Sequence, residues 1–138
     1  IKSAGAIKAD FETVLKESDF ISIHLPLNDH TRKMIGASAF ELMKSKAILI
    51  NTSRGAVIDE NALIEALRNG TINSAGLDTF EIEPLPMDSP LRELDNCVLS
   101  DHVGFYSEES LVELKRKTAE NVLDVLDGRT PRYWVNKF

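Results

Sequence analysis

The sequence predicts an α/β protein built on a parallel β-sheet with flanking helices. Short apolar runs of strand length recur along the chain, and polar residues follow each run. Segments with the three-to-four-residue apolar spacing of a helix separate these runs. This alternation favours parallel strands, because an intervening helix returns the chain to the same end of the sheet. The predicted strands lie at 20–25, 47–51, 74–78 and 97–100.

The first helix is expected at 10–17. Asp10 can cap its amino terminus, and Phe11, Val14 and Leu15 have the spacing of one helical face. Residues 6–9, just before this helix, can form a short strand at most.

Two further helices follow strands or loops in the same way. Ser38 and Glu41 fit a capping box, in which two side chains bind orphan backbone N–H groups, and this pattern predicts a helix near 38–44. Asp59 is expected to cap the next helix. Gly70 is expected to end that helix in a left-handed conformation.

The second half of the chain contains a long loop and the longest helix. The loop at 80–95 holds three of the five prolines, and loops of this length are usually functional or cover a site. After the last strand, Ser107 is expected to open a helix that Gly128 closes.

Composition narrows the functional classes. A chain of 138 residues with 43% hydrophobic and 28% charged residues is expected to form one globular domain. The net charge of −6 disfavours nucleic acid as a partner. The sequence shows no apolar stretch near the roughly 20 residues of a membrane span, so a soluble cytoplasmic protein is expected. Cys97, the single cysteine, is expected to be a buried, inert thiol.

The polar residues after three predicted strands suggest chemistry. Arg54 follows one strand, Asp78 ends the next with Glu83 just beyond it, and His102 follows the last. Parallel strands would bring these ends to one edge of the sheet. Arginine offers a planar fork to a carboxylate, and histidine exchanges protons near neutral pH beside a carboxylate that fixes its tautomer. These residues suit a 2-hydroxy or 2-oxo acid as substrate.

Simpler interpretations remain open for each residue alone. An arginine, glutamate or histidine at a strand end is more often a surface or capping residue. His24 fits a hydrogen-bonded structural histidine as well as a ligand contact, and His30 fits a solvated loop. The histidines have no partners at metal-ligand spacing, so no metal is expected. Ser53 has no nucleophile-elbow motif around it.

Four motifs occur in order along the chain, at 19–27, at 43–44 with 47–55, at 75–84 and at 101–104. They are similar to successive signatures of the D-isomer-specific 2-hydroxyacid dehydrogenases, and the resemblance covers nearly the whole chain. That family includes phosphoglycerate and D-lactate dehydrogenases, glyoxylate reductases and C-terminal-binding-protein corepressors.

The resemblance implies roles for three catalytic residues. Arg54 would hold the substrate carboxylate and carbonyl oxygen, and His102 would exchange the proton on the C2 oxygen. Glu83 would support His102. The implied reaction is hydride transfer between NAD(H) and C2 of the acid.

The resemblance also implies a cofactor site. Asp78 would bind the nicotinamide carboxamide, and Gly55 would let the backbone turn next to the cofactor. The remaining residues of the implied NAD site are His24, Leu25, Pro26, Thr52, Ser53, Arg54, His102 and Gly104.

Two positions near the histidine distinguish this chain. Asp101 stands where the family usually has proline, and a second acid there would strengthen proton binding by His102. Residues 102–110 look closest to the corepressor-like branch, in which an aromatic residue three positions after the histidine shapes the substrate pocket. Phe105 is the candidate for that wall, and a helix-flanking core aromatic is the equally weighted alternative.

The sequence lacks the Gly-x-Gly-x-x-Gly turn that holds a dinucleotide pyrophosphate. The implied fold is therefore a Rossmann-like sheet without its first strands, representing the C-terminal part of the family's chain. Residues 1–127 would form a partial NAD-binding domain, and 128–138 would belong to the substrate domain of the intact protein. NADP is not excluded, because the segment that selects between the cofactors is not in the sequence.

These expectations lead to one main function and two alternatives. The main one is an NAD-dependent oxidoreductase acting on the CH–OH group of a D-2-hydroxy acid, as a fragment with weak NAD binding and little activity alone. The alternatives are a dinucleotide-sensing, corepressor-like binding protein and a catalytically dead remnant. We also expect residues 20–25 to form an open sheet edge, which favours a homo-oligomer, most simply a dimer.

Overall fold

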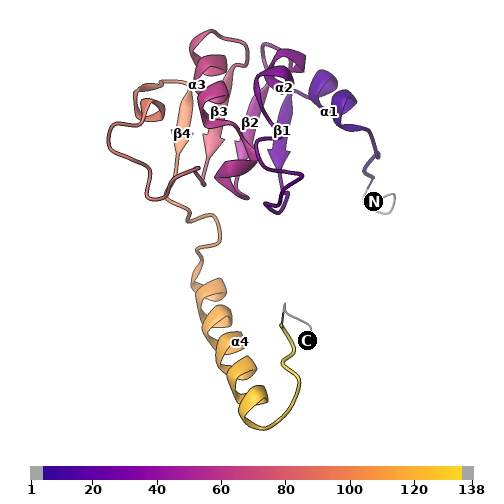
Figure 1. Ribbon diagram of the computed structural model, residues 1–138, viewed down its shortest axis with the longest axis vertical. Helices are drawn as coiled ribbons and strands as arrows, with labels where there is room; N and C mark the ends of the chain where they lie inside the picture. The colour runs from indigo at the N-terminus through magenta and orange to yellow at the C-terminus, as the bar shows by residue number, and fades with distance from the viewer. Residues whose placement is uncertain (1–4, 135–138) are drawn as a thin grey trace. The chain divides into compact units, whose positions relative to one another are not determined.

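The computed structural model describes residues 5–134 and has an α/β fold with a parallel four-stranded sheet (Figure 1). The strand order follows the chain order, and every neighbouring pair is parallel. This confirms the predicted fold class. The predicted domain ranges 1–127 and 128–138 include residues 1–4 and 135–138, which lie outside the described residues.

The four predicted strands are present, with somewhat shorter bounds. The strands are β1 (Phe20–Ile23), β2 (Ile48–Asn51), β3 (Ser74–Leu77) and β4 (Cys97–Leu99). The helices are α1 (Phe11–Glu17), α2 (Ala37–Leu42), α3 (Glu60–Arg68) and α4 (Glu108–Leu126), with 3-10 helices at Gly55–Val57 and Pro90–Glu93. Residues 6–10 have no regular structure, so the short strand considered at 6–9 does not form.

Three of the predicted helix caps are confirmed. Asp10 accepts a hydrogen bond from the Thr13 N–H, and Asp59 accepts one from the Ala62 N–H. Ser107 caps α4 in a reciprocal pair with Ser110. Each cap satisfies a backbone donor that the first helical turn leaves without a partner.

The predicted capping box of Ser38 and Glu41 is wrong. The helix α2 begins one residue before Ser38, and Gly36 occupies the cap position without a side-chain hydrogen bond. Tertiary pairing sets this start, because Ile35 forms a parallel bridge with Ile58 and its carbonyl accepts the Asp59 N–H. The backbone is therefore fixed up to Gly36, where the helix must begin.

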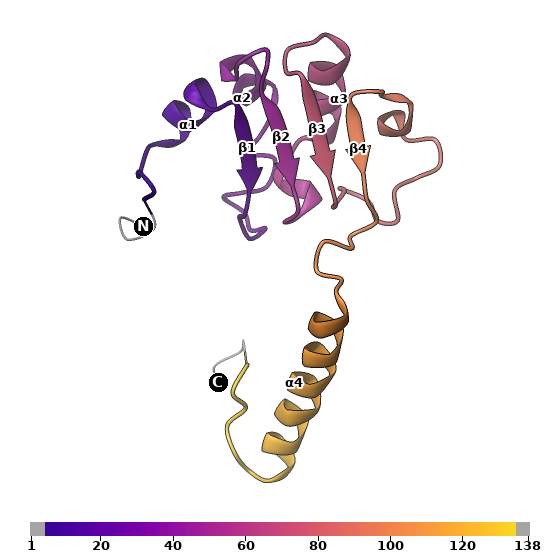
Figure 2. The same cartoon turned by 180° about the vertical axis from the view of Figure 1, so that it is seen from behind.

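The helices α2 and α3 cover one face of the sheet, as the two opposite views show (Figure 2). The core lies between these two helices and the sheet. In it, Phe40 and Leu63 are almost fully buried with the strand residue Leu49. Alternate strand residues point into this core, which fixes the register of the strands. Asn51 occupies such an inward position, in register with Ile23 on one side and Leu77 on the other.

The chain divides into two compact units, 1–104 and 105–138. The first unit contains the sheet and its core. The second unit contains α4, which has no buried residue among its nineteen described residues. Within residues 5–134, no helix is long and apolar enough to cross a lipid bilayer.

Candidate functional site

A buried asparagine organises the turn after β2. The Asn51 side chain is 0% exposed, and its Oδ1 atom accepts hydrogen bonds from the Ser53 N–H at 3.0 Å and the Ser53 hydroxyl at 2.9 Å. Its Nδ2 atom donates to the Arg54 carbonyl at 3.0 Å. A buried amide must satisfy both its donor and its acceptor, and here one turn satisfies both.

Gly55 follows in the same turn and packs against another loop. A Cβ atom placed on Gly55 would lie 1.9 Å from the carbonyl carbon of Phe80. The family resemblance implies that Gly55 lets the backbone turn. The structural requirement is instead a close approach of two backbones, which only the absence of a side chain permits.

The predicted residues His24, Leu25, Pro26, Ser53 and Arg54 line one open cleft of about 570 Å³, together with one further leucine. The His24 Nε2 atom lies 2.8 Å from the hydroxyl of Ser22. The Arg54 Nη1 atom donates to the Ser53 carbonyl at 2.7 Å. The cleft therefore combines an apolar wall with a guanidinium and a hydroxyl.

The Asp78 carboxylate holds the loop that follows β4. It is 5% exposed, and its Oδ1 atom accepts hydrogen bonds from the Ser100 hydroxyl at 2.6 Å and the Val103 N–H at 2.9 Å. Its Oδ2 atom accepts the Gly104 N–H at 2.8 Å. Burial raises the pKa of Asp78, but these three hydrogen bonds and the charge of His102 outweigh burial and lower that pKa overall.

Gly104 fits this loop because it has no side chain. A Cβ atom there would lie 2.8 Å from the Asp78 Oδ2 atom and 3.9 Å from the Thr52 Cβ atom. Three predicted cofactor residues, Thr52, Asp78 and Gly104, thus lie together at the carboxyl end of the sheet. A carboxylate has about four lone-pair sites, so Asp78 can accept one more hydrogen bond.

Glu83 and His102 form the predicted pair. The His102 Nδ1 atom lies 2.8 Å from Glu83 Oε2, and Glu83 Oε1 accepts the Phe80 N–H at 3.0 Å. Burial raises the pKa of Glu83, but the hydrogen bonds from His102 and Phe80 and the positive charges of His102 and Arg54 outweigh it and lower the pKa. Arg54, Glu83 and His102 therefore share one electrostatic neighbourhood.

His102 has an unusual backbone conformation. Its φ angle is +51°, in the left-handed region that favours glycine, and its N–H donates to the Asp78 carbonyl at 2.8 Å. Such a conformation costs free energy and persists where surrounding contacts impose it. Here Asp78 imposes it through both its carbonyl and its carboxylate.

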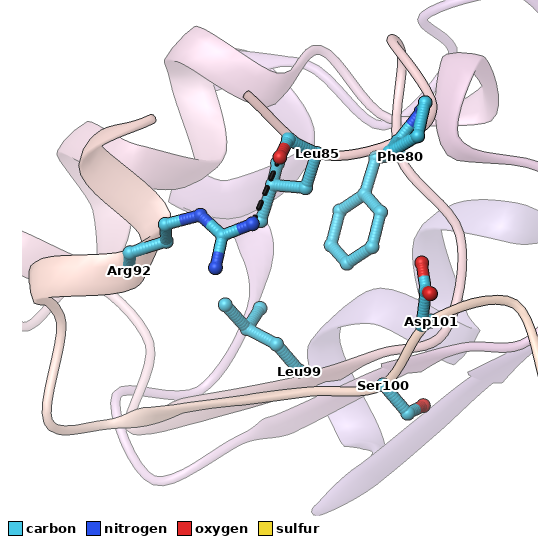
Figure 3. A pocket seen from close by; sticks show the side chains of 7 residues that line it. Phe80, Leu85, Arg92, Leu99, Ser100 and Asp101 are labelled. Carbon is cyan, nitrogen blue, oxygen red and sulfur yellow. Dashed lines mark hydrogen bonds between the residues drawn. The ribbon is translucent and has the colours of Figure 1, made fainter. Parts of the chain in front are cut away.

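A second cavity, of about 320 Å³, lies between the 80–92 segment and the end of β4 (Figure 3). Asp101 and Phe80 line it, and the Arg92 guanidinium at its rim donates to the carbonyls of Leu85 and Pro86 at 2.8 and 2.9 Å. The Asp101 carboxylate lies beside Phe80 in this cavity (Figure 3), and its predicted effect on His102 stays a prediction.

Two other predictions concern Cys97 and Phe105. Cys97 is half-buried, and burial, followed by the negative charge of Glu60, raises the pKa of its thiol to about 11, which fits an inert thiol. Phe105 lies in the second unit, where its ring is edge-on to that of Tyr106 with the ring centroids 5.5 Å apart. Its role in the substrate pocket stays a prediction.

Within residues 5–134, no group of three or more His, Cys, Asp or Glu side chains could hold a metal ion.

Sequence reasoning missed the structural roles of Asn51 and Ser100. A polar residue closing an otherwise apolar strand was the available signal for Asn51, because the alternation places it on the core side of β2. Ser100 gave no comparable signal, since its bond to Asp78 depends on the pairing of β3 with β4.

Comparisons with known proteins agree with this architecture. The chain is 50% identical over 133 residues to a glyoxylate reductase of Thermococcus litoralis, covering 96% of this chain and 40% of the relative. It is 46% identical to a glyoxylate/hydroxypyruvate reductase B of Salmonella newport, covering 92% of this chain and 39% of that relative. The chain thus spans about 40% of the length of these relatives.

Solved structures show the same fold. The TT0316 protein of Thermus thermophilus superposes with a TM-score of 0.88 at 41% identity, covering 93% of this chain and 41% of that one. The D-lactate dehydrogenase of Lactobacillus jensenii, solved with NAD⁺, superposes with a TM-score of 0.84 at 35% identity. The match covers 94% of this chain and 43% of that one. The model of the "D-isomer specific 2-hydroxyacid dehydrogenase, NAD binding domain" family matches residues 1–104. The chain therefore belongs to the D-isomer specific 2-hydroxyacid dehydrogenase family.

Proposed function

We propose that this chain supplies the catalytic and nicotinamide side of an NAD-dependent oxidoreductase that acts on a D-2-hydroxy acid or the corresponding 2-oxo acid. The observation that carries the proposal is the 2.8 Å pair of Glu83 and His102, with the charge of Arg54 acting on the same carboxylate. The names of the two relatives favour glyoxylate or hydroxypyruvate as substrate. They also favour an enzyme over a corepressor-like binding protein.

The residues of the site suit this chemistry. The Arg54 guanidinium can bind the substrate carboxylate, since its fork matches two carboxylate oxygens. Glu83 accepts from Nδ1 of His102, which turns Nε2 toward a substrate and fixes the tautomer of the ring. During reduction, His102 would donate a proton to the C2 oxygen, and in the reverse direction it would accept that proton.

The cleft at His24 to Pro26 fits the nicotinamide end of NAD. Its wall of leucine and proline suits an aromatic ring, and Ser53 and Arg54 offer polar groups beside it. When bound, the cofactor supplies the hydride. Thr52, Asp78 and Gly104 would complete this end of the site, with Asp78 using its remaining acceptor position for the carboxamide. Phe105 would line the substrate pocket.

Catalysis is tested by measuring NADH oxidation by residues 1–138 with glyoxylate or hydroxypyruvate as substrate. We expect weak NADH binding and slow turnover, because the sequence has no glycine-rich pyrophosphate turn. His102→Ala should abolish this turnover, whereas the control His30→Ala, in an exposed loop, should retain it. Micromolar NADH affinity by calorimetry would contradict the weak binding, and turnover that survives His102→Ala would refute the proton-transfer role.

A second test does not depend on turnover. We expect oxamate, a non-reactive analogue of a 2-oxo acid, to shift the NMR signals of the Arg54 and His102 side chains but not that of His30. If neither Arg54 nor His102 responds in the presence of NADH, the proposed substrate site is wrong.

The proposal extends to domain organisation and location. Residues 1–127 would represent part of the NAD-binding domain, and 128–138 would lead into the substrate domain. We expect the enzyme in the cytoplasm, and cell fractionation tests this location. NADP in place of NAD is tested by the same oxidation assay with NADPH.

We further propose a homo-oligomer, with the edge of β1 as its contact. This strand lies at one edge of the sheet, and its Phe20 side chain is 69% exposed. An open strand edge can pair with a second chain. Sedimentation velocity should show a dimer that Phe20→Lys weakens. A monomer whose β1 amides resist hydrogen exchange would argue against this contact.

A further inference from the structure

We infer that Asn51 is the positioning residue that aligns Arg54 with the loop carrying His102. The inference rests on the proposed function, because it concerns how the same site is held in shape. Asn51 touches neither a substrate nor a reacting atom in this scheme. Its amide acts through the backbone of the turn that presents Arg54.

The hydrogen bonds of Asn51 all lead to this turn. The side chain accepts from the Ser53 N–H and hydroxyl and donates to the Arg54 carbonyl, all within 3.0 Å. The two residues that these bonds fix are the ones that line the cleft beside His24. The amide therefore fixes the backbone from which the Arg54 side chain extends. The guanidinium itself lies beyond these hydrogen bonds.

Asn51 also connects this turn to the histidine loop. Its carbonyl accepts the Asp78 N–H at 2.9 Å, and the Asp78 carbonyl accepts the His102 N–H at 2.8 Å. The Asp78 carboxylate binds the rest of the histidine loop. A continuous series of hydrogen bonds thus runs from the Arg54 turn to His102, with one fully buried side chain at its start.

The chemistry of the amide explains why other residues would fail. Aspartate has the same shape, but its ionised form cannot donate to the Arg54 carbonyl and would place two oxygens against each other. Burial favours the neutral acid, which restores a donor. Asn51→Asp should therefore recover its function when the pH is lowered, whereas Asn51→Leu, which has neither group, should not.

The chain offers a matched control in Asn96. Its Nδ2 atom also bridges two backbone carbonyls, those of Leu67 at 3.2 Å and Asn73 at 3.0 Å. It precedes β4, at the end of the sheet opposite to the candidate site. Asn96→Leu and Asn96→Asp should affect stability without changing the site.

The experiment uses residues 1–138 and two readouts for each variant. The first is the backbone NMR signals of Ser53, Arg54 and Asp78 as a function of pH, and the second is oxamate affinity in the presence of NADH. We expect Asn51→Leu to displace these signals at every pH and to weaken oxamate about tenfold, the loss of about one buried hydrogen bond. We expect Asn51→Asp to regain the native signals and affinity on acidification.

The two readouts separate the two ideas. If the native chain binds no oxamate, the proposed function fails, while the NMR signals still decide whether Asn51 sets the turn. The inference is overturned if the Asn51 variants keep native signals at Ser53 and Arg54, if Asn51→Asp shows no recovery at low pH, or if Asn96→Leu weakens oxamate equally. Urea unfolding of each variant identifies any that fails to fold, and Asn51→Ser then replaces Asn51→Leu as the milder deletion.

Discussion

The turn after β2 and the loop after β4 present the two charged groups of the candidate site, but different kinds of group hold them. A neutral amide, Asn51, holds the turn with Arg54, and a carboxylate, Asp78, holds the loop with His102. Both holding groups are buried. The half of the site that Asn51 holds is therefore insensitive to acid, whereas the half that Asp78 holds depends on an ionised group.

The largest effect is expected from Gly55→Ala, which breaks the contact between the β2 turn and the loop of Glu83. The new methyl group would overlap the Phe80 backbone, which has no flexible end that could move aside. We expect the free energy of unfolding to fall by at least about 3 kcal/mol, as measured by urea denaturation. Gly76→Ala is the control, because a Cβ atom there meets no atom within 4 Å. Equal stability of the two variants would contradict the close approach.

Asp78→Asn tests the second half of the comparison. The new amide would keep one acceptor but turn its NH₂ group toward a backbone N–H, so at least one charge-assisted hydrogen bond is lost. We expect a loss of about 2–3 kcal/mol of unfolding free energy, together with changed NMR signals at Val103 and Gly104. Asp101→Asn, which alters an exposed carboxylate next to His102, should change stability by less than about 0.5 kcal/mol.

Acid should weaken the half of the site that Asp78 holds and leave the half that Asn51 holds unchanged. The pKa values of Asp78 and Glu83 lie below their ordinary values of 3.8 and 4.5 in the folded chain, so the unfolded chain binds more protons as the pH falls. The stability from these carboxylates is therefore complete above about pH 5 and is lost as the pH falls through the folded pKa values. Unfolding measured from about pH 7 to about pH 3 should show this slope, and Asp78→Asn should reduce it. An unchanged slope in that variant would assign the acid sensitivity to other groups.

A smaller effect on stability than that of Asp78→Asn is expected from Glu83→Gln. The side chains of Glu83 and His102 are 36% and 41% exposed, and exposed ion pairs contribute little. We expect a change of less than about 1 kcal/mol in unfolding free energy but a clear change in the NMR signals of the His102 ring, because its Nδ1 atom lies 2.8 Å from Glu83 Oε2. Ring signals identical to those of the native chain would show that Glu83 does not act on His102.

Local sequence signals were sufficient for much of the fold. Asp10, Asp59 and Ser107 cap their helices as predicted, because each cap depends only on a short side chain and the next turn. The meeting of Glu83 with His102 was also predictable, since parallel strands bring their carboxyl ends to one edge. Polar residues at strand ends therefore predicted the charged part of the site.

The sequence was insufficient where long-range contacts decide. The start of α2 depends on the pairing of Ile35 with Ile58, which no local pattern near Ser38 reveals. The three donors on Asp78 come from a segment more than twenty positions later in the chain, so its structural role appeared only with the fold. The sequence suggested a ligand contact for Asp78 and missed its role as a support.

The left-handed backbone of His102 has a consequence for selection experiments. At a φ angle of +51°, glycine has a lower backbone energy than histidine, by about 1 kcal/mol, because it has no Cβ atom. A saturation library at position 102 sorted for heat resistance should therefore enrich glycine, whereas a library sorted for turnover should return histidine. Selection for heat resistance alone would accordingly yield thermally more stable chains that lack the group able to exchange a proton with the substrate.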